Sequence, residues 1–334
     1  MPPVLIQGSL SHPPPGPGIV GFTWPKPPPR AVYDLGRPPK MGGWEVKNGE
    51  IYAHFDALNG ALHDTGRVLG IARQISGVTI RDIRARSVGR LINIRGMGAC
   101  LKDSLIEDVR GDELLRGLIN ITGDSSGLVI RRATGRGLAP DPAAGQTPMQ
   151  IGISISGTAH DILIEDVRFE QMGQRREAGK YWNSDGLTIE GEAYNITINR
   201  AVFLNCTDGG VDIKGRNITL GDLRAERCRR NFRFWSSITA ARLTSITPSK
   251  SDPANAGTTA QVWVQGNNTT PPTIVIEHLM VRAEDATPIL TIENGSAQVV
   301  VKSHDIQVPA GTPLVRGGAP GNRIEWGPQG APKL

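Results

Sequence analysis

Charged side chains crowd one stretch of strand-like sequence, residues 181 to 215, which reads YWNSDGLTIEGEAYNITINRAVFLNCTDGGVDIKG. Its acidic and basic residues stand among alternating apolar residues and glycines: Asp185, Glu190, Asp208, Asp212 and Lys214. Carboxyl groups held close together can serve as the acid and base of a cleavage reaction, or as oxygen ligands of calcium. A neighbouring lysine or arginine can accept a proton or bind an anion. The alternating pattern requires a sheet to position these groups.

Composition sets the limits on what this sheet can belong to. The chain has 334 residues, a net charge of +5 and a pI of about 9.3, which suits an acidic partner such as an anionic polysaccharide or nucleic acid. No apolar run approaches the roughly 18 residues of a membrane span. The first residues lack the basic start and apolar block of a signal peptide. We expect an extracellular or virion-associated protein, with a cytoplasmic location left open.

Residues 1 to about 40 contain 12 of the 25 prolines. Proline cannot donate the hydrogen bonds of a helix or a sheet interior. We therefore predict an extended, proline-rich arm over residues 1–45, which either docks on an assembly partner or is a disordered leader. The body is predicted over 46–325, with a tail over 326–334.

From residue 77 the chain repeats. Six segments align without gaps: GVTIRDIRA (77), DSLIEDVRG (103), GLVIRRATG (127), DILIEDVRF (161), NITINRAVF (195) and NITLGDLRA (217). The fourth and seventh positions of these segments are apolar in every copy. So is the twelfth position, which lies three residues after the end of each segment. Cys206 and Cys228 fall in the twelfth column with Val88 and Met172, which indicates stacked core residues and no disulfide framework.

A second strand closes each copy, as in LINIRG (91), GISISG (152), GLTIEG (186) and GVDIKG (210). Its strict alternation predicts one buried face. Strands that recur every 22 to 34 residues, with no helical pattern between them, predict an all-β solenoid of roughly nine coils. Two columns of this strand should point outward. One reads Asn93, Asn120, Ser154, Thr188, Asp212, Arg233, Trp263, Thr291, and the other Arg95, Thr122, Ser156, Glu190, Lys214, Trp235, Gln265, Glu293.

Together with NSDGL (183) and TDGGVDIKG (207), the repeat resembles the pectate-lyase-like superfamily of right-handed parallel β-helices. That superfamily includes polygalacturonase-type hydrolases, calcium-dependent lyases and phage tail spikes. The resemblance to the hydrolases implies catalytic carboxylates at Asp185 and Asp208. It also departs from them, because Gly209 stands where they carry a second aspartate and their downstream motifs are missing.

Neighbouring coils lie about 4.8 Å apart, so the charged residues of coils five to eight should converge. The candidate catalytic residues are Asp185, Asp208, Asp212, Lys214 and Arg233. The candidate substrate-binding residues are Thr188, Glu190, Trp182, Arg230, Trp235 and Trp263. Exposed tryptophan rings would stack on sugars, and the basic groups would pair with uronate carboxylates.

Two mechanisms stay open. In a hydrolase, Glu190 and Asp212 would lie about 8 Å apart, within the spacing of inverting enzymes. In a lyase, Lys214 or Arg233 would be the base, and Asp185, Asp208 and Asp212 would bind Ca²⁺. No cofactor is expected for a hydrolase.

We therefore predict a protein that recognises, and in our main hypothesis cleaves, an acidic or polyhydroxylated polysaccharide. The alternative is a non-catalytic tail-spike or adhesin β-helix, with possible trimerisation or docking through the arm. Nucleic acid ranks third, because the arginines scatter among acids and no nucleic-acid motif is present. The charged face could also be only a solvated face with cross-strand ion pairs, such as Glu190 with Lys214.

Overall fold

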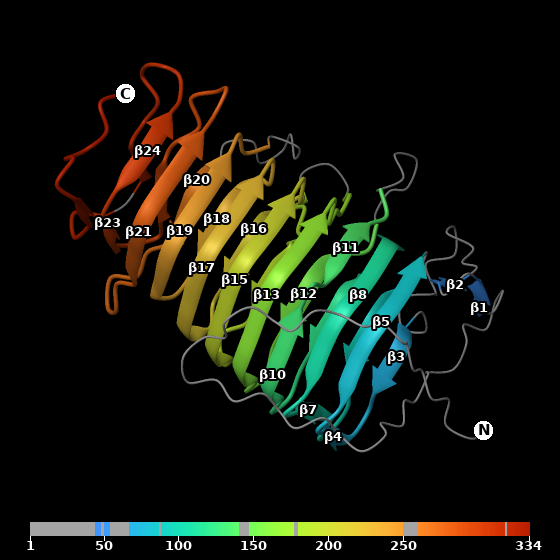
Figure 1. Cartoon of the computed structure of the whole chain (residues 1–334). Coiled ribbons are helices and arrows are strands. Elements are labelled where there is room, and N and C mark those ends of the chain that lie inside the picture. The colour runs from blue at the N-terminus through green and yellow to red at the C-terminus, as the bar shows by residue number, and fades with distance from the viewer. Residues whose placement is uncertain are drawn as a thin grey trace.

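A computed structural model describes residues 44–47, 50–53, 67–86, 88–139, 147–176, 180–249, 259–317 and 319–334. Within these ranges the chain forms strands and turns, and no helix in them is long and apolar enough to cross a membrane. The strands stack along one axis as a solenoid (Figure 1).

The first sheet has 16 strands. They are β1 (Trp44–Lys47), β2 (Glu50–Ala53), β4 (Gln74–Ser76), β5 (Thr79–Arg86), β7 (Cys100–Lys102), β8 (Leu105–Leu114), β10 (Ser126–Arg131), β11 (Thr134–Gly137), β13 (His160–Glu170), β15 (Tyr194–Leu204), β17 (Arg216–Glu226), β19 (Ile238–Ile246), β21 (Thr273–Arg282), β23 (Gln298–Val301), β24 (His304–Gln307) and β26 (Arg323–Trp326).

The second sheet has ten strands. They are β3 (Arg67–Ile71), β6 (Arg90–Ile94), β9 (Gly117–Ile121), β12 (Ile151–Ile155), β14 (Leu187–Ile189), β16 (Gly209–Ile213), β18 (Arg230–Phe234), β20 (Ala260–Gln265), β22 (Leu290–Glu293) and β25 (Val315–Gly317). Apart from the antiparallel β1–β2 pair, the pairings in the described ranges are parallel, and the chain alternates between the sheets. This is the parallel β-helix that the repeat predicts.

The predicted register is confirmed. The fourth column of the repeat pairs Ile130 with Ile164 and Ile164 with Ile198 across neighbouring coils. In the second sheet Thr188 pairs with Asp212 and Asp212 with Arg233. Ten stacked strands in the described part of the second sheet agree with roughly nine coils. The right-handed sense stays the prediction that the chirality of parallel crossovers makes.

The long strands of the first sheet bend at residues with positive φ. Asp166 in β13 has φ 55° and Arg200 in β15 has φ 50°. Because a left-handed residue interrupts the alternation of side chains, the inward positions shift by one. In β13 they pass from Ile162 and Ile164 to Val167 and Phe169, all buried.

The core lies between the two sheets and needs glycine where large rings enter it. Phe169 and Phe203 stack with their ring centroids 6.4 Å apart. A Cβ on Gly186 would lie 2.3 Å from Cδ1 of Phe203 and 2.6 Å from the carbonyl oxygen of Gly210. Glycine at 186 therefore leaves room for a ring of the next coil. Cys206 and Cys228 are buried free thiols of this stack, as predicted.

Two predictions about organisation are not decided by these strands. The proline-rich arm lies outside the described residues except for its last two, Trp44 and Glu45, which belong to β1. The last strand, Arg323–Trp326, crosses the predicted boundary between body and tail. The domain boundaries therefore stay predictions.

Candidate functional site

Three aspartates meet where the chain enters the second sheet on neighbouring coils. Asp185 lies just before β14 and Asp208 just before β16, while Asp212 is inside β16. Backbone bonds fix the stacking, because Asp208 N donates to Ser184 O (3.0 Å) and Arg230 N donates to Asp208 O (3.0 Å). All three aspartates are at most 2% exposed. The predicted convergence is confirmed, but the outward-facing position predicted for Asp212 is buried.

Asp208 is fully buried among basic groups. Arg230 Nη1 donates to its Oδ1 (3.0 Å), and Arg233 Nη1 donates to its Oδ2 (2.9 Å). The Tyr181 hydroxyl donates to Oδ2 as well (2.5 Å). Two guanidinium groups therefore neutralise this carboxylate, as a buried charge requires.

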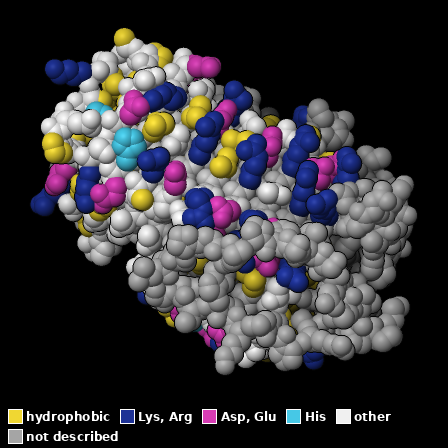
Figure 2. All heavy atoms as spheres, viewed as in Figure 1, with side chains coloured by type: hydrophobic (Ala, Val, Ile, Leu, Met, Phe, Trp, Pro, Cys, Tyr) yellow, Lys and Arg dark blue, Asp and Glu magenta, His cyan; other side chains and the backbone are white. Residues whose placement is uncertain are grey.

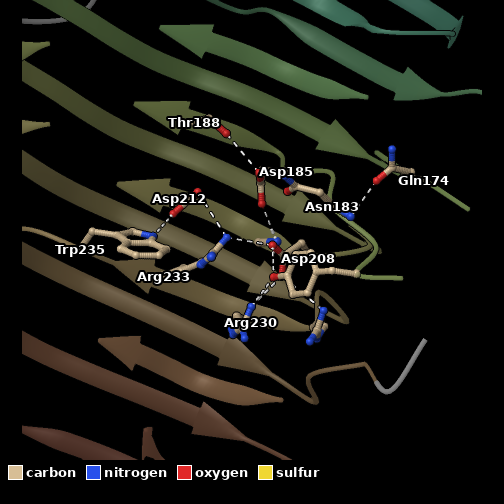
Figure 3. Close-up of polar contacts among 12 residues, drawn as sticks. Gln174, Asn183, Asp185, Thr188, Asp208, Asp212, Arg230, Arg233 and Trp235 are labelled. Carbon is tan, nitrogen blue, oxygen red and sulfur yellow. Dashed lines mark hydrogen bonds and ion pairs between the residues drawn. The ribbon is translucent and has the colours of Figure 1, made fainter. Parts of the chain in front are cut away.

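Asp212 shares one of these cations, and Figure 3 shows Arg233 reaching between Asp212 and Asp208. Arg233 Nη1 lies 3.4 Å from Asp212 Oδ2, and the indole Nε1 of Trp235 donates to Oδ1 (2.7 Å). Burial raises the pKa of Asp212, while the positive charges of Arg233 and Lys214 oppose that rise. Asp212 is thus a carboxyl group whose affinity for a proton is increased.

The carboxyl group of Asp185 is held by neutral groups. Its Oδ1 accepts a hydrogen bond from the backbone N of Gly209 (2.7 Å), and its Oδ2 lies 3.2 Å from the Thr188 hydroxyl. Burial, followed by the negative charges of Asp208 and Asp212, raises the pKa of Asp185 well above its usual range. Asp185 is therefore the carboxyl group of this cluster with the strongest tendency to hold a proton.

Lys214 lies between Glu190 and Asp212. Its Nζ is 2.9 Å from Glu190 Oε1 and 3.3 Å from Asp212 Oδ2. Burial lowers the pKa of Lys214, but the charges of Asp212 and Glu190 outweigh that effect and raise it. The predicted Glu190–Lys214 ion pair is confirmed. The ammonium group also fills the space where the predicted Glu190–Asp212 pair would have held a water molecule, so that pair is not arranged for hydrolysis.

The two tryptophans differ from the predicted pair of exposed stacking rings. Trp263 is only 2% exposed, so the prediction of an open ring is wrong for it. The guanidinium carbons of Arg230 and Arg233 lie 5.0 and 5.2 Å from its ring centroid. Trp235 is half-buried and lies 4.8 Å from the guanidinium carbon of Arg233. Trp263 thus packs its buried ring against both guanidinium groups, and the half-buried Trp235 lies at the edge of the cluster.

The segment before β14 covers Asp208. Tyr181 accepts a hydrogen bond from Arg230 while donating to Asp208, and Arg229 lies 4.4 Å from its ring centroid. Gln174 holds the segment, because its Oε1 accepts from the backbone N of Asn183 (2.9 Å). Burial is the largest cause of the raised pKa of Tyr181, and the negative charge of Asp208 raises it further. The phenol therefore stays protonated.

The three aspartates do not fit a calcium ion as they are arranged. Calcium needs six to eight oxygen ligands, yet Arg230, Arg233 and Lys214 contact the oxygens of Asp208 and Asp212. In the part of the chain that the structure describes, no group of three or more His, Cys, Asp or Glu side chains could hold a metal ion. We therefore derive no step through calcium.

Most of the predicted site residues lie together: Asp185, Thr188, Glu190, Asp208, Asp212, Lys214, Arg230, Arg233, Trp235 and Trp263. Trp182 is half-buried and follows Tyr181 in the chain. The sequence pattern did not predict that Tyr181 contacts Asp208 or that Arg229 lies against the Tyr181 ring. The Arg-Arg pair at 229 and 230, at the start of β18, was the signal that could have found Arg229.

Comparisons with known proteins add little to this site. No family model and no curated protein matches the chain. Among solved structures, the enzymatically active domain of tailspike protein 2 of bacteriophage CBA120 is similar, with a TM-score of 0.43 and 11% sequence identity. The match covers 84% of this chain and 46% of that one, so this chain spans less than half the length of the tailspike domain. The chain is a parallel β-helix protein with a buried aspartate–arginine cluster on its second sheet.

Proposed function

We propose that this β-helix binds a polysaccharide against β14, β16 and β18 and hydrolyses its glycosidic bonds. The observation that carries the proposal is the pair Asp185 and Asp212, two carboxyl groups of one cluster whose pKa values are both raised. Glycoside hydrolysis uses one protonated and one ionised carboxyl group that flank the bond to be broken.

In this mechanism Asp185 gives its proton to the glycosidic oxygen as the bond to the departing sugar breaks. Asp212 takes a proton from the water molecule that attacks the anomeric carbon. One water is consumed, and proton exchange with solvent restores both groups. Asp208 is the counter-ion that holds Arg230 and Arg233 in place.

Elimination is the less suitable reaction for this geometry. The lyase mechanism needs Lys214 or Arg233 to accept a proton. Ion pairing with Asp212 and Glu190 raises the pKa of Lys214, and the charges of Asp212 and Asp208 raise that of Arg233 against the opposing effect of burial. Both groups therefore stay charged and serve better as binders of an anionic or hydroxyl-rich substrate.

The proposal is tested on a panel of anionic and neutral polysaccharides, following reducing ends together with the ultraviolet absorbance of unsaturated sugars. We expect new reducing ends without the unsaturated product. Asp185→Asn should lower the rate by roughly 10²–10⁴-fold, the usual contribution of a general acid. The matched control Asp222→Asn changes an exposed aspartate of β17 and should leave the rate unchanged. An unsaturated product would show that the reaction is elimination and not hydrolysis.

A second function, adhesion without cleavage, is favoured by one observation. The aspartates are nearly inaccessible, and Asp208 and Asp212 have their charges compensated inside the protein. A receptor-binding β-helix of a virion surface would need no carboxyl group that is accessible to a substrate. Binding of a polysaccharide with no new reducing ends, together with a trimer by light scattering, would support this function over hydrolysis.

A further inference from the structure

A row of arginines runs along the solenoid axis on the first sheet, away from the aspartate cluster. We define the arginine row as Arg84, Arg110, Arg168 and Arg224. Arg84 is paired in register with Arg110, Arg110 with Thr134, and Thr134 with Arg168; Val202 then links Arg168 to Arg224. All four side chains are exposed, with Arg168 and Arg224 at 50% and 48%.

The regular fold spaces these charges one coil apart between Arg84 and Arg110, and two coils apart from Arg110 to Arg168 and from Arg168 to Arg224. Each coil advances about 4.8 Å, so the row extends over roughly 24 Å from β5 to β17. Figure 2 shows Lys and Arg side chains gathered along the upper part of this face, with fewer Asp and Glu between them. A single straight line of guanidinium groups is complementary to a linear polyanion lying along the axis.

The neighbouring residues leave a positive surplus. Two positions further along the same strands stand Arg86, Asp112, Arg136, Glu170, Leu204 and Glu226. Including these and Glu113, which contacts Arg86 at 2.7 Å, six arginines face four acids over six coils. Arg168 and Arg224 each contact an acid of their own strand, Glu170 at 3.4 Å and Glu226 at 2.8 Å. Exposed pairs of this kind contribute little, so an incoming anion can replace them.

We propose that the arginine row is a second binding surface, which holds a linear acidic polysaccharide along the solenoid axis. A polysaccharide fits better than a single-stranded nucleic acid, because nucleic-acid grooves place aromatic side chains among the basic ones for base stacking. The positions of the row contain Thr134 and Val202 between the arginines, and no aromatic residue. The surface is independent of the cleavage reaction proposed for the second sheet.

The test measures binding of polygalacturonate to the full chain, in wild type and in an Asp185→Asn background so that cleavage cannot shorten the polymer. The row variant is Arg84→Gln/Arg110→Gln. The matched control, Arg323→Gln/Lys333→Gln, removes the same charge from exposed residues near the C-terminus. We expect roughly tenfold weaker binding for the row variant, as two exposed ionic contacts would give, and less than a twofold change for the control.

Binding by the row should also weaken as salt is added, because the contacts are exposed. A single-stranded oligothymidylate should bind at least tenfold more weakly than polygalacturonate. Equal losses in the two double variants would show that only net charge matters and would overturn the proposal. Tighter binding of oligothymidylate, or no binding of polygalacturonate by the wild type, would overturn it too. None of these results depends on whether the second sheet cleaves a substrate.

Discussion

Arg233 joins Asp208 and Asp212 through a single nitrogen, Nη1, which lies 2.9 Å from Oδ2 of Asp208 and 3.4 Å from Oδ2 of Asp212. This contact links the turn before β16 to the middle of that strand. It also keeps two buried negative charges within reach of one positive charge. The cluster is therefore one connected network, in which a substitution at one residue alters the hydrogen bonds and ion pairs of the others.

Asp208→Asn should strongly destabilise the fold. The substitution leaves Arg230 and Arg233 buried without their shared counter-ion, and breaking a buried ion pair typically costs about 3–5 kcal/mol. Urea unfolding followed by circular dichroism measures the loss. The control Asp222→Asn, in an exposed pair with Arg242, should stay within about 0.5 kcal/mol of wild type. Similar effects of both substitutions would contradict the ion-paired cluster.

Asp185→Asn should have the opposite effect on stability at neutral pH. Because the pKa of Asp185 is raised in the folded chain, the folded state keeps a proton that the unfolded carboxyl has lost. The stability from this group is thus present at acid pH and lost as the pH rises through the folded pKa. Asparagine needs no proton and can keep the contacts to Gly209 and Thr188.

We therefore expect Asp185→Asn to be more stable than wild type at about pH 7–8, by about 1.4 kcal/mol for each unit of pKa shift that it removes. The advantage should shrink as the pH falls toward about 4, where the unfolded carboxyl is protonated as well. Thermal melts across this pH range make the comparison. An advantage that does not depend on pH would show that Asp185 is not protonated in the folded chain.

Gly186→Ala should destabilise the chain and displace Asp185, its neighbour. The new Cβ would overlap Phe203 and the carbonyl oxygen of Gly210, and overpacking of this kind costs about 1–3 kcal/mol. Gly191→Ala is the matched control, because its Cβ would approach nothing closer than the carbonyl oxygen of Lys214 at 4.0 Å. Urea unfolding of both variants should separate them. Equal stability would mean that the packing around Phe203 is looser than described.

Tyr181→Phe tests whether the phenol must leave Asp208 before a substrate can bind. The variant loses the hydroxyl that bridges Asp208 and Arg230 but keeps the ring beside Arg229. Hydrogen bonds to charged groups contribute about 1.5–3 kcal/mol, so KM for the cleaved polysaccharide should fall by roughly tenfold or more with kcat little changed. A large fall in kcat would instead place the hydroxyl in the reaction itself.

The sequence predicted the fold and the register because both follow from alternation. Ile130, Ile164 and Ile198 share a column of the first sheet, and the alternation of the second strand separately places Asp212 beside Arg233. Burial of that face was not predictable in the same way. It depends on side chains crossing between coils, as Arg230 and Arg233 do over Trp263.

The acid and base assignments needed the structure for a similar reason. Spacing placed Glu190 and Asp212 at a suitable separation, but only the side-chain geometry shows Lys214 between them. Likewise, the segment containing Tyr181 is irregular, and no repeat column fixes where its ring lies. The repeat columns therefore identified the charged strand residues of the cluster, and the contacts of each carboxyl group decided its chemistry.

The most direct test of the account measures activity and stability of Asp185→Asn on the same purified sample. If Asp185 is a buried proton donor, the variant should unfold at a higher urea concentration than wild type at neutral pH and should release almost no reducing ends from the polysaccharide that wild type cleaves. Full activity in the variant, or the absence of cleavage of every polysaccharide by wild type, would contradict hydrolysis at this cluster.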